Sequence, residues 1–474
     1  MSRSEWEMVI GLEVHTELRT ATKLFCGCAN HFGDEPNTNV CPVCLGLPGS
    51  LPVLNRTAVE YAIRIGTALH CTVQPSLFHR KNYFYPDMPK DYQISQYDVP
   101  INADGWLALP DGRRVGIERA HIEEDTGKST HVGESGRIHG ADHSLVDYNR
   151  AGVPLVEIVG RPDLRSGDDA RIYVDELRAI LVATGASDGK MEEGSLRVDA
   201  NVSVRPRGAA DLGTRCEIKN MNSLRSLGRA IEYEATRQIT LLEEGGTVSQ
   251  ETRHWDEGTG RTSTMRSKED AYDYRYFPEP DLVPIVPSEE WIRAVADALP
   301  PMPGDRRSAV AAAAKLAPDA DPVVTVVRLD LDSLLHAAVA AGADGGLAVK
   351  RLANEVASSL ERAAVLDPVA FATVVQMESR SALTPAQART VLKDLLEGGG
   401  DPAAIAKAHG FEAMASDALA DAVDQVIAEN PGEWERFAGG EDKVQGFLIG
   451  KIKAATGGNA DLKEASALLR GRRS

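Results

Sequence analysis

The stretch GSLRVDANVSVR, residues 194–205, alternates between polar and aliphatic side chains without a break. Such strict alternation predicts a β-strand with one buried face. A solvated outer face would account for the pattern taken alone. However, the polar face carries short groups suited to hydrogen bonding and ligation, rather than the Lys, Glu and Thr common on solvated strands: Arg197, Asp199, Asn201 and Ser203.

Two other segments show the same alternation and the same kind of polar face. Residues 9–18 place Glu13 and His15 on one face, and residues 214–220 place Lys219 on a face with further charged groups. Carboxylates hold Mg²⁺ through oxygen, and Arg or Lys neutralises phosphate oxygens. Three such strands together favour a site for magnesium-assisted phosphoryl transfer over a solvated face.

The segment HIEEDTGKS, residues 121–129, adds three consecutive acidic residues, of which Glu123 and Glu124 are candidate Mg²⁺ ligands. Three acidic residues in a row usually form a solvated turn. The assignment of Glu123 and Glu124 as Mg²⁺ ligands therefore depends on the polar strands described above. The GKS ending is similar to the end of a P-loop, but Ile122 stands where that motif requires its first glycine. Any nucleotide must therefore be held by another architecture.

A cysteine quartet near the N-terminus has the spacing of a metal site. Cys26 and Cys28 are separated by twelve residues from the pair Cys41 and Cys44. Four thiolates close a tetrahedral Zn²⁺ site and leave no open position, so the predicted zinc is structural. The first pair is tighter than the usual spacing, which makes His31 an alternative ligand. Buried free thiols and a C-x-x-C redox pair are the other interpretations.

The length of the chain indicates the number of domains, and its net charge limits how it can bind nucleic acid. A chain of 474 residues accommodates about three domains. The net charge of −18 argues against broad nucleic-acid binding by the whole surface, although a local basic patch is compatible with it. The sequence has no apolar run of about 18 residues and no apolar signal core at its start. These features predict a cytoplasmic protein with no membrane segment.

Composition changes near residue 280, where a proline-rich seam begins. All eleven tyrosines precede this seam, and an alanine-rich, helical region follows it. Within that region Thr384, followed by proline and then Gln387, predicts a capped helix start, and Gly398 predicts the end of the helix. The glycine-rich joint at 398–402 divides the helical region in two.

Ten motifs that occur in order along residues 5–470 resemble one known family. They include VIGLEVHTEL, HIEEDTGKSTH, MEEGSLRVDANVSVRP, RSKEDAYDYRYFPEPDL and the tail KVQGFLIGKIKAATGG, with YFYPDMPKDYQISQ and DYRYFPEPDL the most specific blocks. The chain is thereby identified as similar to the B subunits of tRNA-dependent Asp/Glu amidotransferases, the GatB family.

The resemblance implies an α+β fold with three domains. Residues 1–293 would form a catalytic domain built on an antiparallel sheet of the glutamine synthetase/guanido kinase type and carrying the zinc loop. Residues 294–399 would form a helical domain, and residues 400–474 a YqeY-like tail that binds tRNA. The polar face of the 194–205 strand would then be part of the active-site floor.

The implied activity is an ATP- and Mg²⁺-dependent ligase reaction. The side-chain carboxylate of a mischarged Glu-tRNA(Gln) or Asp-tRNA(Asn) is phosphorylated, and ammonia then displaces the phosphate. An amidase A subunit would supply the ammonia from glutamine through a channel, and a small C subunit would complete a heterotrimer. The mischarged tRNA would contact the C-terminal helical domains.

Matching the family motifs residue by residue gives the expected roles. The catalytic residues would be Glu13, His15, Glu124, Glu157 and Lys81. The ATP-binding residues would be Arg80, Arg197, Asp199, Asn201, Ser203 and Lys219. The Mg²⁺ ligands would be Glu13, Glu123, Glu124 and Glu157, and the Zn²⁺ ligands Cys26, Cys28, Cys41 and Cys44.

Two other functions are compatible with the motifs. One is a glutamine-synthetase-like ligase for a free small acid, which would need neither partner subunits nor a helical tail. The other is a nonenzymatic, zinc-braced tRNA-binding scaffold, which would not need Glu13, His15 or Glu124. Within the amidotransferase interpretation, the sequence leaves open whether Glu-tRNA(Gln), Asp-tRNA(Asn) or both are substrates.

Overall fold

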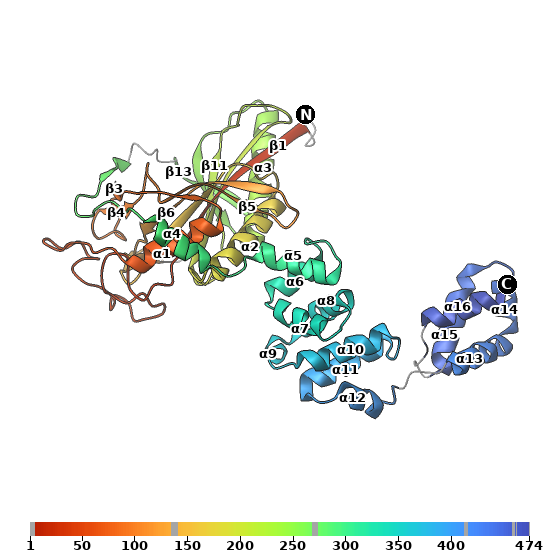
Figure 1. The fold of residues 1–474 in the computed structure, drawn as a ribbon. Coiled ribbons are helices and arrows are strands. Elements are labelled where there is room, and N and C mark those ends of the chain that lie inside the picture. The colour runs from red at the N-terminus through yellow and green to blue at the C-terminus, as the bar shows by residue number, and fades with distance from the viewer. Residues whose placement is uncertain are drawn as a thin grey trace. The chain divides into compact units, whose positions relative to one another are not determined.

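The computed structural model describes residues 5–133, 141–267, 274–411, 416–456, 460 and 462–473 (Figure 1). The chain divides into two compact units, residues 1–303 and 304–474. The first is built around an antiparallel-rich sheet and the second is helical, which confirms the predicted order of mixed α/β and helical regions. Residues 268–273 and 457–458, which belong to two of the motifs above, lie outside the described residues.

The main sheet has nine strands in the order β13-β12-β11-β10-β1-β9-β6-β5-β2. All described neighbours in it pair antiparallel except β11 and β12, which pair in parallel. The strands are β1 (Trp6–Glu17), β2 (Thr72–Val73), β5 (Asn102–Ala108), β6 (Arg114–Glu124), β9 (Pro154–Gly160), β10 (Leu196–Pro206), β11 (Cys216–Lys219), β12 (Glu251–Asp256) and β13 (Arg261–Ser267).

The three strands predicted from alternation lie side by side in the sheet centre. β1 pairs with β10 along its length, so that Glu13 is opposite Asp199 and His15 is opposite Arg197. β10 pairs in turn with β11. Because each strand alternates with period two, their polar side chains share one face of the sheet. The pairing of β10 with β1 and with β11 therefore combines the three polar strand faces predicted from the sequence into one polar surface.

Among the described residues of this unit, four helices accompany the sheet: α1 (Arg56–Ala68), α2 (Gly167–Ala183), α3 (Leu224–Glu243) and α4 (Glu289–Asp297). The aliphatic strand face and the buried sides of α1, α2 and α3 belong to one hydrophobic core. Within it, Leu12 and Val14 of β1 are buried with Tyr173 and Leu177 of α2. Burial of this face fixes the register, since a one-residue slip would turn the aliphatic groups to water.

Close packing holds α1 against the sheet. The Asn102 side-chain amide donates to the carbonyl oxygens of Ala62 in α1 and of Ala120 in β6, both at 3.0 Å. A Cβ on Gly66 would lie 1.9 Å from the Asn102 side-chain oxygen. Only glycine therefore allows this approach.

Two small sheets complete the unit. One has the order β14-β3-β4, from β3 (His79–Asn82), β4 (Tyr92–Ser95) and β14 (Phe277–Pro278). It joins chain segments almost two hundred residues apart and carries both of the most specific motifs. The other is the hairpin of β7 (Lys128–Val132) and β8 (His143–Asp147).

The helical unit contains two separate hydrophobic clusters. The first involves residues 310–411 and the second residues 419–469. The helices are α5 (Pro303–Ala314), α6 (Asp321–Arg328), α7 (Asp332–Ala340), α8 (Gly345–Asn354), α9 (Leu360–Ala363), α10 (Pro368–Ser379), α11 (Pro385–Gly398), α12 (Pro402–Ala408), α13 (Ser416–Glu429), α14 (Pro431–Ala438), α15 (Gln445–Ala455) and α16 (Leu462–Arg473), with 3₁₀ turns at Val356–Ser358 and Asp442–Val444.

The predicted cap and end of α11 are both present. Thr384 accepts from the Gln387 backbone N–H, and the Gln387 side chain accepts from the Thr384 backbone N–H, which is a complete capping box. The helix ends at Gly398, and Gly399 follows with a φ of 67°. α12 packs in the first cluster, where Ala406 is buried.

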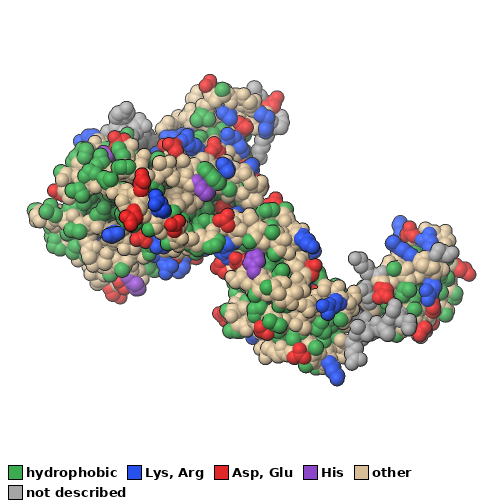
Figure 2. Space-filling view, viewed as in Figure 1, with side chains coloured by type: hydrophobic (Ala, Val, Ile, Leu, Met, Phe, Trp, Pro, Cys, Tyr) green, Lys and Arg blue, Asp and Glu red, His purple; other side chains and the backbone are tan. Residues whose placement is uncertain are grey.

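Acidic and basic side chains are interspersed over the visible face of each unit (Figure 2). Among the described residues, no helix is both long enough and apolar enough to cross a membrane.

Candidate functional site

A cavity of about 370 Å³ opens on the polar face of the main sheet. Its floor comes from β1, β6, β9, β10 and β11, and part of its wall comes from the small β14-β3-β4 sheet. Seven of the residues predicted for the site line it: Glu13, His15, Lys81, Glu123, Glu157, Asp199 and Lys219. The structure thus brings together side chains that are up to about two hundred positions apart in the sequence.

One histidine and two carboxylates lie at the centre of the cavity. The Nε2 atom of His15 is 3.8 Å from a Glu123 oxygen and 3.9 Å from a Glu157 oxygen. One ligand atom from each of these three residues lies within 4.8 Å of the others. This separation and these atom types suit a divalent cation, and carboxylate oxygens are the ligands that Mg²⁺ prefers.

A second histidine supports this group from β6. His121 is paired with Glu157 across the β6–β9 register, and its Nε2 lies 3.2 Å from a Glu157 oxygen. Burial alone would raise the pKa of Glu157, but the charges of His121 and His15 hold it well below its usual range. Glu157 is therefore ionised at neutral pH. Ser95 also donates to Glu123, at 3.2 Å.

A network of charges continues along the floor toward β11. Asn201 donates to the Glu13 carboxylate at 2.9 Å. The Lys219 ammonium pairs with Asp199 and lies 3.3 Å from Glu217. Burial opposes the positive charge, but both carboxylates raise the pKa of Lys219 above its usual value, so it stays protonated.

Three more cationic side chains line the same cavity. Lys81 projects from β3 and lies 4.5 Å from the centre of the Tyr274 ring. Arg119 and Arg215 enter from β6 and from the residue before β11. Together with Lys219, these groups can neutralise several phosphate oxygens beside the carboxylates.

Glu124 lies outside this cavity. β6 extends through Glu124, so Glu123 faces the cavity and Glu124 faces the other side of the strand. There its carboxylate pairs with Lys90 and accepts from the backbone N–H of Ile94 at 2.8 Å. It lines a second cavity, of about 60 Å³, next to the cysteine loop. The structure does not bring it together with the other predicted Mg²⁺ ligands.

Arg80 and Ser203 also lie away from the cavity. Arg80 alternates with Lys81 in β3 and forms two hydrogen bonds with the buried Glu279, at 2.6 and 2.9 Å. Ser203 is buried, and its hydroxyl lies 3.5 Å from the Val9 carbonyl. Neither side chain is placed to reach a ligand in the cavity.

Arg197 belongs to a neighbouring cluster on the same sheet face. It donates to Asp125 at 2.7 Å, and Arg150 lies 3.4 Å from the same carboxylate. Glu17 borders this group. Burial and the charge of Asp125 raise the pKa of Glu17 to about 8, although Arg197 and Arg150 oppose the rise.

Sequence reasoning passed over several cavity residues, of which His121 is the most closely engaged. Alternation along RAHIEE would have found it, since Arg119, His121 and Glu123 occupy every second position of β6. Interpreting the acidic run as a turn concealed that period. Tyr97 and Tyr276 also line the cavity. Tyr97 lies just after the short strand β4 and Tyr276 just before the short strand β14, so neither belongs to an alternating sequence pattern that could have predicted its position.

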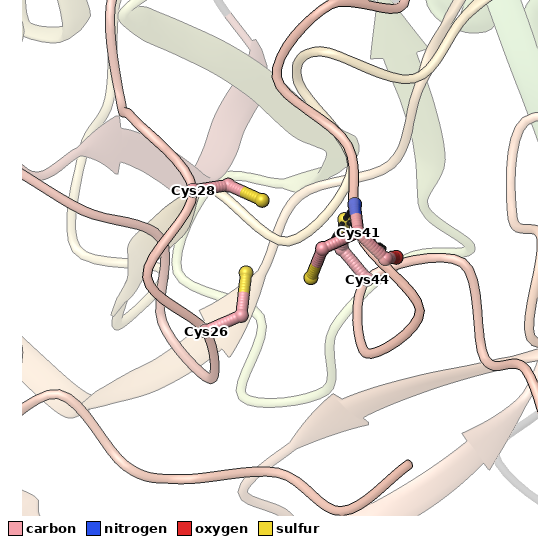
Figure 3. A group of neighbouring side chains, drawn as sticks. All are labelled: Cys26, Cys28, Cys41 and Cys44. Atoms are coloured by element: carbon pink, nitrogen blue, oxygen red, sulfur yellow. Dashed lines mark hydrogen bonds between the residues drawn. The ribbon is translucent and has the colours of Figure 1, made fainter.

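The cysteine quartet forms a compact group in the loop after β1. Cys26 and Cys28 face the Cys41–Cys44 pair, and the four sulfur atoms lie within 4.8 Å of one another (Figure 3). This arrangement could bind a metal such as zinc. His31, the alternative ligand, is 70% exposed at its side chain and pairs with Asp34 at 2.8 Å.

The surroundings shift the thiols of the quartet in opposite directions. A hydrogen bond from Cys26 lowers the pKa of Cys44 to about 5, and the charge of Lys23 contributes to this shift. The same hydrogen bond and burial raise the pKa of Cys26, and burial raises the pKa of Cys28 to about 11. Lys23 is fully buried and donates to the Tyr148 carbonyl at 3.2 Å. A buried cation next to the sulfur atoms would offset part of the negative charge of a tetrathiolate site.

Comparisons with known proteins cover almost the whole chain. Residues 8–293 match the model of the GatB/GatE catalytic domain, and residues 333–472 match that of the GatB domain. Proteins named as the B subunit of aspartyl/glutamyl-tRNA(Asn/Gln) amidotransferase are similar throughout. The one from Frankia casuarinae is 50% identical over 98% of this chain and 95% of its own length. The one from Carboxydothermus hydrogenoformans is 46% identical over 98% of this chain and 98% of its own length. The one from Streptomyces coelicolor is 47% identical over 98% of this chain and 95% of its own length.

The quartet leads to a direct prediction of metal content. The chain purified from zinc-supplemented cells should contain about one zinc ion, measured by inductively coupled plasma mass spectrometry. Replacing Cys41 and Cys44 together by serine should reduce the content to background. Cys71→Ser, outside the quartet, should retain full zinc. A metal-free wild-type chain would contradict the assignment.

Glu17 should make stability depend on pH. Its folded pKa of about 8 lies above the ordinary value of 4.5, so the folded state holds an extra proton between these values. Stability from this group is fully present below about pH 4.5 and is lost as pH rises through 8. Glu17→Gln should therefore be more stable than wild type by roughly 4 kcal/mol at pH 8 and equal to it near pH 4.5.

Urea unfolding at the two pH values measures this difference, with the exposed Glu192→Gln as the matched control. A constant difference between wild type and Glu17→Gln at both pH values would show that Glu17 is ionised in the folded chain.

Proposed function

The chain belongs to the GatB family of amidotransferase B subunits, and on that basis we propose that it catalyses the ATP-dependent step of tRNA-linked amidation. The substrate is the side-chain carboxylate of Glu-tRNA(Gln) or Asp-tRNA(Asn). One carboxylate oxygen bonds to the γ-phosphorus of ATP while the bond to ADP breaks. Ammonia then attacks the carbonyl carbon of the acyl phosphate, phosphate leaves, and the amide remains on the tRNA.

The observation that carries this proposal is the joint presence of carboxylates and cations in one cavity. The His15, Glu123 and Glu157 atoms have the spacing of a cation site. Lys81 and Lys219 line the cavity beside them. A nucleoside triphosphate with its divalent cation needs both kinds of group, since the carboxylates hold the cation and the lysines face the phosphates.

Each side chain has a role that follows from its contacts. Glu123, Glu157 and His15 would hold Mg²⁺, with Glu13 close to them on β1. His121 orients Glu157 and keeps it ionised.

The cations act on the phosphates and the acyl carboxylate. Lys81, Arg119, Arg215 and Lys219 offset the negative charge of phosphate and bring the carboxylate close to it. When bound, Mg²⁺ supplies additional charge neutralisation at the phosphate oxygens.

The predicted roles of Glu124 as a catalytic residue and of Arg80 as an ATP-binding residue come from the sequence motifs and have no support from the contacts of these side chains. The Lys90 pair of Glu124 and the Glu279 pair of Arg80 support structural roles for both. We therefore assign the Mg²⁺ role on β6 to Glu123. The cysteine quartet would hold zinc outside the reacting centre and brace its loop.

The partners follow from the chemistry of the substrate and from the names of the relatives, each of which is a B subunit. We assign ammonia supply to a glutamine-hydrolysing amidase A subunit, with a small C subunit completing the complex. The catalytic domain, predicted at residues 1–293, would be of the glutamine synthetase/guanido kinase type, followed by helical domains predicted at 294–399 and 400–474. Because α4 and α12 pack in the preceding clusters, we place the two joints near residues 303 and 411. The reaction takes place in the cytoplasm, where tRNA is charged.

The tail supplies a basic surface for the tRNA. Lys451 and Lys453 are exposed on α15, and Lys443 precedes the helix. The ammonium of Lys451 lies 5.4 Å from the ring centre of Phe447, which is itself 45% exposed. Lysines next to an exposed aromatic ring suit a phosphate backbone with unpaired bases.

The decisive assay is conversion of Glu-tRNA(Gln) to Gln-tRNA(Gln) by the assembled heterotrimer with ATP, Mg²⁺ and glutamine. Glu157→Gln should reduce the rate by roughly 10²–10³-fold, because it removes a carboxylate that would hold Mg²⁺ beside the phosphate oxygens. Its tRNA affinity should stay within about twofold of wild type. The exposed Glu192→Gln, away from the cavity, is the matched control.

Equal loss of tRNA binding and amidation in Glu157→Gln would contradict the catalytic role. A wild-type complex that converts neither Glu-tRNA(Gln) nor Asp-tRNA(Asn) would favour the free-acid ligase or the tRNA scaffold.

The tail lysines should contribute through phosphate contacts. Replacing Lys443, Lys451 and Lys453 by alanine should weaken tRNA binding and make it less dependent on salt. The slope of log affinity against log salt should fall by about one for each lysine that contacts a phosphate. Lys128→Ala, an exposed lysine of β7, is the control, and an unchanged slope in the triple variant would assign tRNA binding to another surface.

A further inference from the structure

A buried threonine connects β12 to the cationic part of the catalytic cavity. Thr252 lines the cavity and is 2% exposed. Its hydroxyl donates to one carboxylate oxygen of Glu217 at 2.8 Å. The other oxygen of Glu217 lies 3.3 Å from the Lys219 ammonium. Glu217 therefore links a hydroxyl that is fixed in a strand to a cation that we assign to the phosphates.

The parallel pairing of β11 with β12 creates this contact. Glu217 is opposite Thr252 in that register, and Asn201 of β10 is opposite Glu217 on its other side. The next residue of β12, Arg253, points to the opposite face, where its guanidinium lies 3.2 Å from the fully buried Glu234 of α3. A one-residue slip of β12 would separate these two buried charges. The ion pair thus favours the register that turns Thr252 toward the cavity.

The hydrogen bond from Thr252 fixes the orientation of the Glu217 carboxylate. Both oxygens of a carboxylate can accept, so the group can turn two oxygens toward one cation or serve two donors at once. With Thr252 bound to one oxygen, only the other is directed at Lys219. Asp199 pairs with the same ammonium from β10. The position of the ammonium is therefore set between two carboxylates.

This control matters because a lysine carries its charge on a flexible four-carbon stem. Without the Thr252 hydroxyl, both oxygens of Glu217 could turn toward Lys219. The ammonium would then be drawn toward Glu217 and away from a bound phosphate. Its charge would be unchanged, but its placement for catalysis would be lost.

We propose that Thr252 is a positioning residue for phosphoryl transfer, which acts through Glu217 to hold the Lys219 ammonium against the phosphates of ATP. This inference rests on the proposed function. It adds to the reaction a residue that contacts neither the nucleotide nor the acyl group.

The test uses the assembled heterotrimer. Thr252→Val removes the hydroxyl at nearly constant volume, Thr252→Ala is a second variant without it, and Thr252→Ser retains it. Ser226→Ala is the matched control. Ser226 donates to Glu257 at 2.6 Å and Glu257 pairs with Arg229, which repeats the order of hydroxyl, carboxylate and cation outside the cavity. Unchanged glutaminase activity shows that each variant complex is assembled.

The first measurement is the rate of amidation of Glu-tRNA(Gln). Thr252→Val and Thr252→Ala should each reduce kcat about tenfold, because a hydrogen bond to a charged group is lost. The KM for Glu-tRNA(Gln) should stay within about twofold of wild type, since the tRNA contacts are unchanged. Thr252→Ser and Ser226→Ala should keep the wild-type kcat.

The second measurement shows whether Thr252 acts through Lys219. Equilibrium binding of the nonhydrolysable ATP analogue adenylyl imidodiphosphate, with Mg²⁺, is compared in wild type, Thr252→Val, Lys219→Ala and the double variant. Thr252→Val should weaken binding about threefold or more when Lys219 is present. In the Lys219→Ala background the same substitution should have no further effect.

Equal weakening in both backgrounds would show that Thr252 acts independently of Lys219 and would overturn the proposal. It is also overturned if Thr252→Val leaves either kcat or analogue binding within about twofold of wild type, or if Thr252→Ser loses as much as Thr252→Val. The binding cycle requires no turnover. Its failure is therefore distinct from failure of the proposed function, which would appear as a wild-type complex without amidation.

Discussion

Mutual repulsion among the carboxylates of the cavity is the constraint that the catalytic unit has to meet. Glu123 and Glu157 both lie within 4 Å of the His15 Nε2, and Glu13 is on the same strand face. Like charges this close are tolerated only beside positive charge or hydrogen-bond donors. His121 and Lys219 provide part of that compensation from the protein itself. The remaining negative charge makes the group receptive to a divalent cation.

Strand pairing is what creates this concentration of charge. β9, β1 and β10 are adjacent, and their antiparallel register sets Glu157 and Arg197 on either side of His15. The opposite face of the same strands is aliphatic and buried under helices, so the polar groups have no alternative position. Hydrophobic burial therefore holds the charged face in place, although it contributes nothing to the chemistry. The part of the cavity wall that carries Lys81 belongs to a separate small sheet, whose pairing is independent of this register.

Local periodicity in the sequence predicts the floor well and the walls poorly. Glu13, His15 and Asp199 follow from alternation within single strands, and the cysteine quartet follows from short spacing. Glu124 shows the limit, since two adjacent glutamates look equivalent until the end of β6 is known. The pairing of Tyr97 with Tyr276 depends on contact between segments 179 positions apart in the sequence, which no local pattern encodes. In the helical region the start of α11 was predictable, because the capping hydrogen bonds between Thr384 and Gln387 form within a single helical turn.

The two glutamates at the end of β6 restrict how the length of this chain can vary during evolution. Glu123 faces the catalytic cavity and Glu124 faces Lys90 beside the cysteine loop. Inserting or deleting one residue within the strand would reverse every side chain beyond it, so two unrelated sites would be damaged by a single event. Variation in length among relatives is accordingly expected in the β5–β6 turn around residues 109–113, where the chain reverses direction before either site is reached.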